Sequence, residues 1–116
     1  MRVLQVAAKA LSLATFALPL MRRLREAGFE VEALSGFDGF EARIQAENFK
    51  IYPWRMNHTL NPLILWRARR ELAAFLERND YDFVHTHCSF AGIVANPVAY
   101  QRAGVLYTQH GFFTHE

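Results

Sequence analysis

The chain of 116 residues lacks the features that mark several broad classes of protein. Its single cysteine, Cys88, cannot form a disulfide within the chain, which favours a reducing compartment such as the cytoplasm. Its formal net charge of +2 is too small to indicate nucleic-acid binding. No apolar run approaches the roughly 20 residues that span a bilayer. We therefore expect a cytoplasmic protein that is not a nucleic-acid-binding module and that contacts a membrane at most at its surface.

One apolar segment, residues 10–21, has to be distinguished from a secretory leader, because basic residues precede it. No small-x-small cleavage site follows this segment, and three arginines come directly after it. Residues 3–6 already have the pattern of a first strand. We therefore interpret residues 10–21 as part of the folded chain.

The composition, 52% apolar and 21% charged, is that of a globular domain. Strand and helix patterns alternate over residues 1–116 without a linker or repeat, which is typical of βαβ units in one domain. The expected strands are Arg2–Ala7, Glu30–Leu34, Lys50–Pro53, Phe83–His87 and Val105–Gln109. The expected helices are a first one ending at Ala27, then Gly39–Glu47, one from Asn61-Pro62 to about Arg78, and about Phe90–Arg102.

Local signals support the helix ends. Gly28 can adopt the left-handed conformation that closes the first helix, and Pro19 predicts that this helix starts or kinks near it. Asn61 can cap the third helix, because its side chain accepts from free amides and Pro62 has no amide that needs a partner.

Parallel strands joined by right-handed crossovers predict a Rossmann-like, doubly wound α/β sheet of order 3-2-1-4-5. Ligands of such sheets bind beyond the carboxyl ends of the strands. The first and fourth strands flank the switch point in this order. We therefore expect His87 and Cys88 beside a loop at residues 8–13, with His110 one strand further out.

Histidines end both late strands. We interpret His85 as a buried, hydrogen-bonded core residue, and His87, nearer the open end, as a donor to a ligand hydroxyl or phosphate. His110 is expected to face the crevice, while Gly111 lets the backbone turn and a substrate approach it. Ser89 opens a helix whose free amides favour an anion, although a serine there is more often only a helix cap.

The order of these segments resembles a known family. Residues 81–92 (YDFVHTHCSFAG), 99–102 and 106–113 (LYTQHGFF), together with 18–24 and 27–31, are similar to the N-terminal, acceptor-side domain of family four glycosyltransferases. These enzymes have the GT-B fold, and the similarity is strongest to polysaccharide-type members with a subfamily 4-like N-terminal domain. Each pattern is loose alone, but their common order and spacing cover nearly the whole chain.

The resemblance implies transfer of a sugar from a nucleotide-sugar donor to a glycan or lipid-linked acceptor, with no required metal and no further cofactor. It places His110 at the cleft near the transferred sugar, and His87 and Ser89 on the acceptor side, with Gly111 allowing close approach. The segment 7–13 lacks the glycine common in the family. Lys9 or Ser12 would therefore have to contact the donor phosphate by side chain.

The resemblance also implies a second, donor-binding domain that is absent from these 116 residues. Because catalysis in a cleft needs groups from both sides, we expect the chain alone to be an inactive, truncated half of a GT-B enzyme. We also expect it to be poorly soluble or oligomeric by itself, because no final helix covers its fifth strand.

Two other functions stay open. Asp82, His85 and His87, with His110, His115 and Cys88, supply zinc-ligand types, as in a metal-dependent hydrolase. The His-x-His pair falls on a fourth strand, however, and a barrel of that kind needs about twice this length. A non-catalytic flavodoxin-like or Rossmann-like binding module fits the strand count.

Two arginine clusters, residues 22–25 and 67–70, are expected on exposed helix faces. Such faces are usually only solvated. Their functional alternative is peripheral contact with anionic lipid at the inner face of the membrane, which would suit an enzyme that builds lipid-linked glycans.

Overall fold

The computed structural model describes residues 1–55, 61–87, 95–97, 99 and 104–108. For residues 106–108 it describes the backbone alone. Five parallel strands form a sheet in the order β3-β2-β1-β4-β5, which confirms the predicted Rossmann-like α/β topology. The strands are β1 (Arg2–Lys9), β2 (Glu30–Gly36), β3 (Lys50–Pro53), β4 (Phe83–His87) and β5 (Gly104–Thr108).

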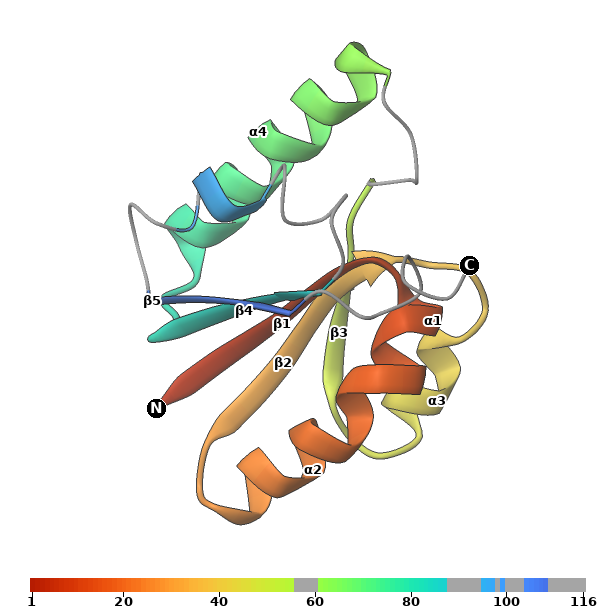
Figure 1. Cartoon of the computed structure of the whole chain (residues 1–116), viewed down its shortest axis with the longest axis vertical. Helices are drawn as coiled ribbons and strands as arrows, with labels where there is room; N and C mark the ends of the chain where they lie inside the picture. Colours follow the sequence, from red (N-terminus) through yellow and green to blue (C-terminus); the bar gives the residue numbers. More distant parts are fainter. Residues whose placement is uncertain (56–60, 88–94, 98, 100–103, 109–116) are drawn as a thin grey trace.

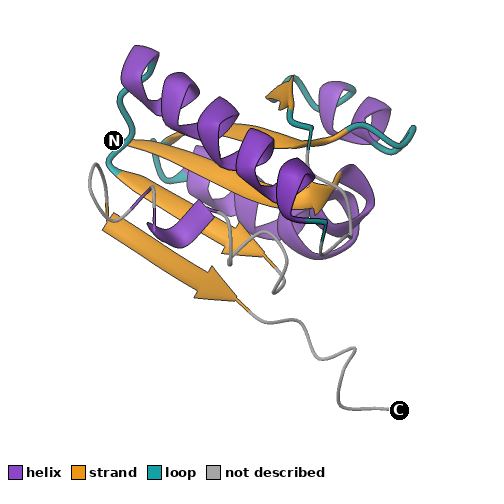
Figure 2. Cartoon of the chain, turned by 90° about the horizontal axis from the view of Figure 1, so that it is seen from above, coloured by secondary structure: helices purple, strands orange, loops and turns teal. Residues whose placement is uncertain are grey.

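Helices cover the sheet in two layers (Figure 1). One layer is a continuous helical stretch, α1 (Ala10–Ser12), η1 (Leu13–Ala17) and α2 (Leu18–Glu26), together with α3 (Glu41–Gln45). The other layer is α4 (Pro62–Arg78), which lies along the strands on the opposite face (Figure 2). No helix among the described residues has the length and apolar character needed to cross a bilayer.

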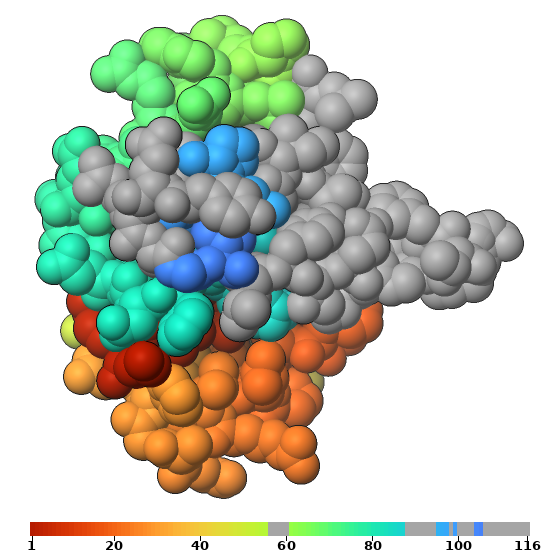
Figure 3. Space-filling view, turned by 60° about the vertical axis from the view of Figure 1, so that its left-hand side comes forward, coloured from red at the N-terminus to blue at the C-terminus, as the bar shows by residue number. Residues whose placement is uncertain are grey.

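Strand β1 lies at the centre of the sheet and is buried on both faces. Because side chains alternate along a strand, Leu4 and Val6 pack in the cluster that contains Leu72 and Leu76 of α4. Ala7 packs in the other cluster, with Leu13 and Met21 among its members. The space-filling view shows the start of β5 at the surface, between the α4 layer and the α2 layer (Figure 3).

The junction after β1 differs from the expectation. β1 continues to Lys9, which keeps extended dihedrals (φ −131°, ψ 142°), and helix begins at once with Ala10, so the expected loop at residues 8–13 does not form. The helical stretch contains a π-helical turn, in which the Leu18 amide donates to the Leu13 carbonyl. Helix therefore begins well before Pro19, which follows the π-helical turn as the second residue of α2, so the missing amide falls where the hydrogen-bond pattern changes.

Both predicted caps are confirmed. Gly28 has a φ of +97°, the left-handed conformation that glycine adopts without strain. The side chain of Asn61 accepts a hydrogen bond of 3.0 Å from the amide of Leu63 at the start of α4. The helix expected at 39–47 is shorter and covers Glu41–Gln45. Gly39 has a left-handed φ of +100°, and its amide donates to the Glu41 carboxylate at 2.8 Å, so residue 39 belongs to the turn before the helix.

A polar network ties the amino ends of the strands. Arg2 donates to the carbonyl of Asp80 at 2.7 Å and to the carboxylate of Glu32 at 3.2 Å. The hydroxyl of Tyr81 donates to the same carboxylate at 2.5 Å. Burial, together with this hydrogen bond, raises the pKa of Tyr81 far above its usual value, so the phenol stays neutral at physiological pH. This end of the sheet is therefore a structural clamp, opposite the edge where ligands of such sheets bind.

We predict that Leu72→Ala lowers the free energy of unfolding by about 2–5 kcal/mol, because it leaves a cavity between α4 and the sheet. Leu63→Ala removes the same atoms from the same helix at a position that is 54% exposed, and it should change stability little. Urea unfolding followed by circular dichroism measures both. Equal effects would contradict the packing of α4 on the sheet.

Candidate functional site

The predicted site residues that the structure describes lie near the carboxyl ends of the strands. Lys9 is the last residue of β1 and is exposed, and Ser12 is half-buried on α1. His87 is the last residue of β4, the neighbour of β1. The other predicted residues, Ser89, His110 and Gly111, lie outside the described residues, as does Cys88.

A buried polar row runs across β1 and β4 on the face that α2 covers. Gln5 is fully buried, and its amide oxygen accepts a hydrogen bond of 2.6 Å from Nε2 of His87, which is 1% exposed. The rings of His85 and His87 are close, with centroids 4.1 Å apart and an interplanar angle of 36°. The row therefore holds the His87 ring in one orientation at the last residue of β4.

The buried position of His85, 7% exposed, confirms its prediction as a core histidine. His85 and Gln5 both line a mostly apolar hollow of about 230 Å³ between the sheet and α2. The other lining residues are Val3, Leu20, Leu24, Phe29 and Phe83. The amide nitrogen of Gln5 has no hydrogen-bond partner within the described part of the chain, a cost that proteins rarely leave uncompensated.

The burial of His87 bears on its expected role. The ring of His87 is 1% exposed and bonded to Gln5, so it fixes the end of β4 in place. Its predicted contact with a ligand stays a prediction. Thr86, between the two histidines, points to the other face, where its hydroxyl donates to the side chain of Asn96 at 2.8 Å. The end of β4 is thus anchored on both faces of the sheet.

The sequence alone did not indicate two residues that contact the site. Gln5 is the only polar residue within the apolar run 3–8, and a lone amide in a strand buried on both faces is a signal that could have indicated it. Asp38, in the connection after β2, accepts a hydrogen bond of 3.1 Å from the Leu11 amide at the start of α1. In proteins where a glycine-rich loop precedes a helix, amides at the helix start bind phosphate. Here the Asp38 carboxylate already accepts from such an amide.

The metal-site alternative gains no support from the described residues, which contain no group of three histidine, cysteine or acidic side chains able to hold a metal ion. Asp82 lies at the amino end of β4, where its carboxylate accepts from the Arg2 amide at 2.8 Å. His87 ends the same strand five residues later, roughly 16 Å away at the usual rise of a strand. Asp82 and His87 therefore cannot share a metal ion.

Comparisons with known proteins agree with this architecture. Residues 13–116 match the model of the family described as Glycosyltransferase Family 4. A search of the curated proteins found no match to the chain.

Solved structures share the fold. MurG from Acinetobacter baumannii has a TM-score of 0.74 at 19% identity, and the match covers 93% of this chain and 34% of that one. A glycosyltransferase from Rickettsia africae has a TM-score of 0.73 at 14% identity, covering 93% and 28%. UDP-GlcNAc 2-epimerase from Methanocaldococcus jannaschii has a TM-score of 0.73 at 11% identity, covering 100% and 34%. The chain therefore spans about a third of each of these proteins.

The buried row generates a prediction on stability. His87→Leu should lower the free energy of unfolding by about 1–3 kcal/mol, because it leaves both polar atoms of the Gln5 amide buried without partners. The double variant Gln5→Leu/His87→Leu removes the amide as well and should recover most of that loss. Chemical denaturation of the two single variants and the double variant measures the coupling. Strictly additive effects would contradict the hydrogen bond between the two side chains.

Proposed function

Because the chain belongs to Glycosyltransferase Family 4, we propose that it is the acceptor-side half of an enzyme that transfers a sugar from a nucleotide-sugar donor. The acceptor in this proposal is a glycan or a lipid-linked glycan. The family match over residues 13–116 carries the proposal, and the order of the five parallel strands supports it by bringing the ends of β1, β4 and β5 to one edge. A second domain would bind the donor and close the cleft.

In the proposed reaction, the bond between the anomeric carbon and the diphosphate oxygen of the donor breaks, and an acceptor oxygen bonds to that carbon. The nucleoside diphosphate leaves with the electron pair, and its released oxygen takes the proton of the acceptor hydroxyl. His110 holds the reacting sugar by hydrogen bonding, while Ser89 contacts the acceptor and Gly111 allows it to approach the backbone. The exposed Lys9 and half-buried Ser12 are the side chains available to a donor phosphate at the end of β1.

His87 takes a positioning role in this scheme. Its bond to Gln5 holds the last residue of β4, and Ser89 follows two residues later in the chain. A fixed strand end lowers the cost of ordering the acceptor-binding segment when substrate arrives. This proposal invokes neither metal nor cofactor, and the isolated half should be inactive because the donor-binding groups belong to the other domain.

The test of sugar transfer uses the protein that carries both halves. His110→Ala should lower kcat by roughly a hundredfold, the usual scale for removing one hydrogen-bond donor from a reacting centre. His115→Ala, five residues further along, is the matched control and should retain activity. Turnover of radiolabelled nucleotide sugars, with circular dichroism to verify folding, measures both variants.

Two results would contradict the assignment. Unchanged turnover in His110→Ala would remove that residue from the site. Loss of activity in both variants, together with inhibition by a chelator and recovery with zinc, would favour the metal-dependent alternative instead.

We also propose that α4 brings the enzyme to the cytoplasmic face of a membrane. The two arginine clusters differ in this respect. Arg22 and Arg25 are already engaged on the protein, since Arg22 bonds to the carboxylate of Glu47, which follows α3, and Arg25 bonds to the backbone carbonyl of the same residue. On α4, by contrast, Arg67 and Arg70 form no ion pair among the described residues, and the same helix exposes the apolar side chains of Leu63 and Trp66, which are 54% and 53% exposed. Basic and apolar groups on one helix are the combination that binds anionic interfaces.

Vesicle flotation tests this contact. Leu63→Gln should reduce the fraction of protein that floats with vesicles containing phosphatidylglycerol, because it removes apolar surface that would enter the interface. Leu11→Gln, at a position of α1 in the other layer that is 42% exposed, is the matched control and should float like the wild type. Equal flotation of both variants would exclude α4 as the docking helix.

A further inference from the structure

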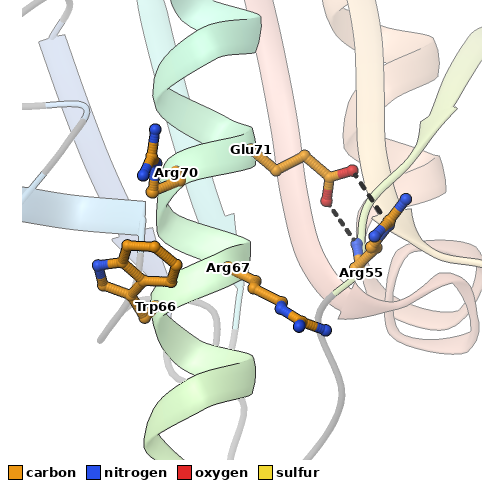
Figure 4. Close-up of a pocket in the computed structure, with 5 residues that line it drawn as sticks. All are labelled: Arg55, Trp66, Arg67, Arg70 and Glu71. Carbon is orange, nitrogen blue, oxygen red and sulfur yellow. Dashed lines mark hydrogen bonds and ion pairs between the residues drawn. The ribbon is translucent and has the colours of Figure 1, made fainter.

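The first half of α4 carries an open hollow lined by three arginines, one glutamate and one tryptophan (Figure 4). Its volume is about 260 Å³, and its lining residues are Arg55, Trp66, Arg67, Arg70 and Glu71. Four of these residues form two neighbouring rows on the helix, because residues four apart lie one above the other. Arg55, which follows β3, borders the hollow next to Glu71.

The only carboxylate of this lining is already occupied. One oxygen of Glu71 accepts from the backbone amide of Arg55 at 2.8 Å, and the other lies 3.8 Å from the Arg55 side chain. Glu71 therefore holds Arg55 at the border of the hollow and neutralises its charge (Figure 4). Two further guanidinium groups, those of Arg67 and Arg70, share the same space.

Neither of these two arginines has a carboxylate partner within the described part of the chain. Arg70 lies over the ring of Trp66, 5.0 Å from its centroid, which holds its side chain beside the hollow. Arg67 forms no ion pair among the described residues and extends toward Arg55, whereas Arg70 borders the hollow on the side of Trp66 (Figure 4). Like charges gathered without a partner favour an anion between them.

We propose that this hollow binds a phosphate group, with Arg67 and Arg70 as its principal ligands. Arginine presents paired donors that match phosphate oxygens, and several guanidinium groups around one anion add charge as well as geometry. The volume is below the roughly 300–1,000 Å³ of pockets that enclose a drug-sized ligand. It fits a phosphate group with its ester carbons, which would pack against the exposed ring of Trp66.

This inference goes beyond the sugar transfer proposed above and does not depend on it. The phosphate could belong to a lipid headgroup or to a soluble phosphate ester, since both present the same oxygens to the arginines. The two sources are distinguished by the probes: inorganic pyrophosphate in solution, and phosphatidylcholine vesicles with and without phosphatidic acid.

The full chain contains two tryptophans, which makes fluorescence a local readout. Trp66 lies in the hollow, whereas Trp54 is buried and donates to the carbonyl of Ala68 at 2.9 Å. Each probe should give a saturable change in tryptophan emission if it binds. Trp66→Phe should abolish that change, and rising salt should weaken the binding.

Substitutions on α4 make the test specific. Arg67→Gln should lower the association constant about tenfold or more, the scale of a hydrogen bond to a charged group. Arg69→Gln removes the same charge from the same helix outside the hollow, and it should change the association constant less than about twofold. Glu71→Gln should raise the association constant, because it removes the negative charge from the lining. If these residues had only a structural role, Glu71→Gln would not raise the association constant.

Binding of pyrophosphate that depends on Arg67 and not on Arg69 would assign soluble phosphates as ligands. The same dependence seen only with phosphatidic acid vesicles would assign a lipid headgroup. Equal losses in Arg67→Gln and Arg69→Gln would show only diffuse attraction to a basic helix and would overturn the proposal. The absence of saturable binding of either probe to the correctly folded chain would overturn it as well.

Discussion

Parallel pairing of β1 with β2 and with β4 is the constraint on which the rest of this structure depends. Because every strand runs in the same direction, each connection must cross a face of the sheet, and helices are thereby laid on both sides. Because the strands are parallel, all their carboxyl ends lie on one side of the sheet. Their amino ends lie on the opposite side, where Arg2, Glu32 and Tyr81 form a clamp. The candidate site and the structural clamp are thus separated by the full length of the strands.

Burial of β1 on both faces makes its one amide side chain consequential. Gln5 bonds to His87 and leaves its nitrogen unpartnered within the described part of the chain. An apolar residue would avoid that cost, so the amide is a local weakness in the core that coincides with the predicted site. The proposed function gives this arrangement a purpose, since it orients the strand end from which the acceptor-binding segment begins.

The two arginine clusters show how neighbouring elements decide what a charge does. Both have a similar sequence pattern, three arginines within four residues. On α2, Arg22 and Arg25 reach Glu47, and Arg25 also lies over the ring of Phe49 at 4.1 Å. On α4, the nearby carboxylate, Glu71, is engaged by Arg55 instead. One cluster therefore fastens a helix to its neighbour, while the other leaves charge at the surface for a partner.

The sequence by itself determined the strand order, the two helix caps at Gly28 and Asn61, and the burial of His85. These features follow from local periodicity and from the few ways in which parallel strands connect. Only the tertiary structure decided that helix begins directly at Ala10, that Gln5 meets His87, and that Glu71 is engaged by Arg55 while Arg67 has no ion pair among the described residues. Such contacts join residues far apart in the chain, and a hydrogen bond depends on distances of a few ångströms that packing alone sets.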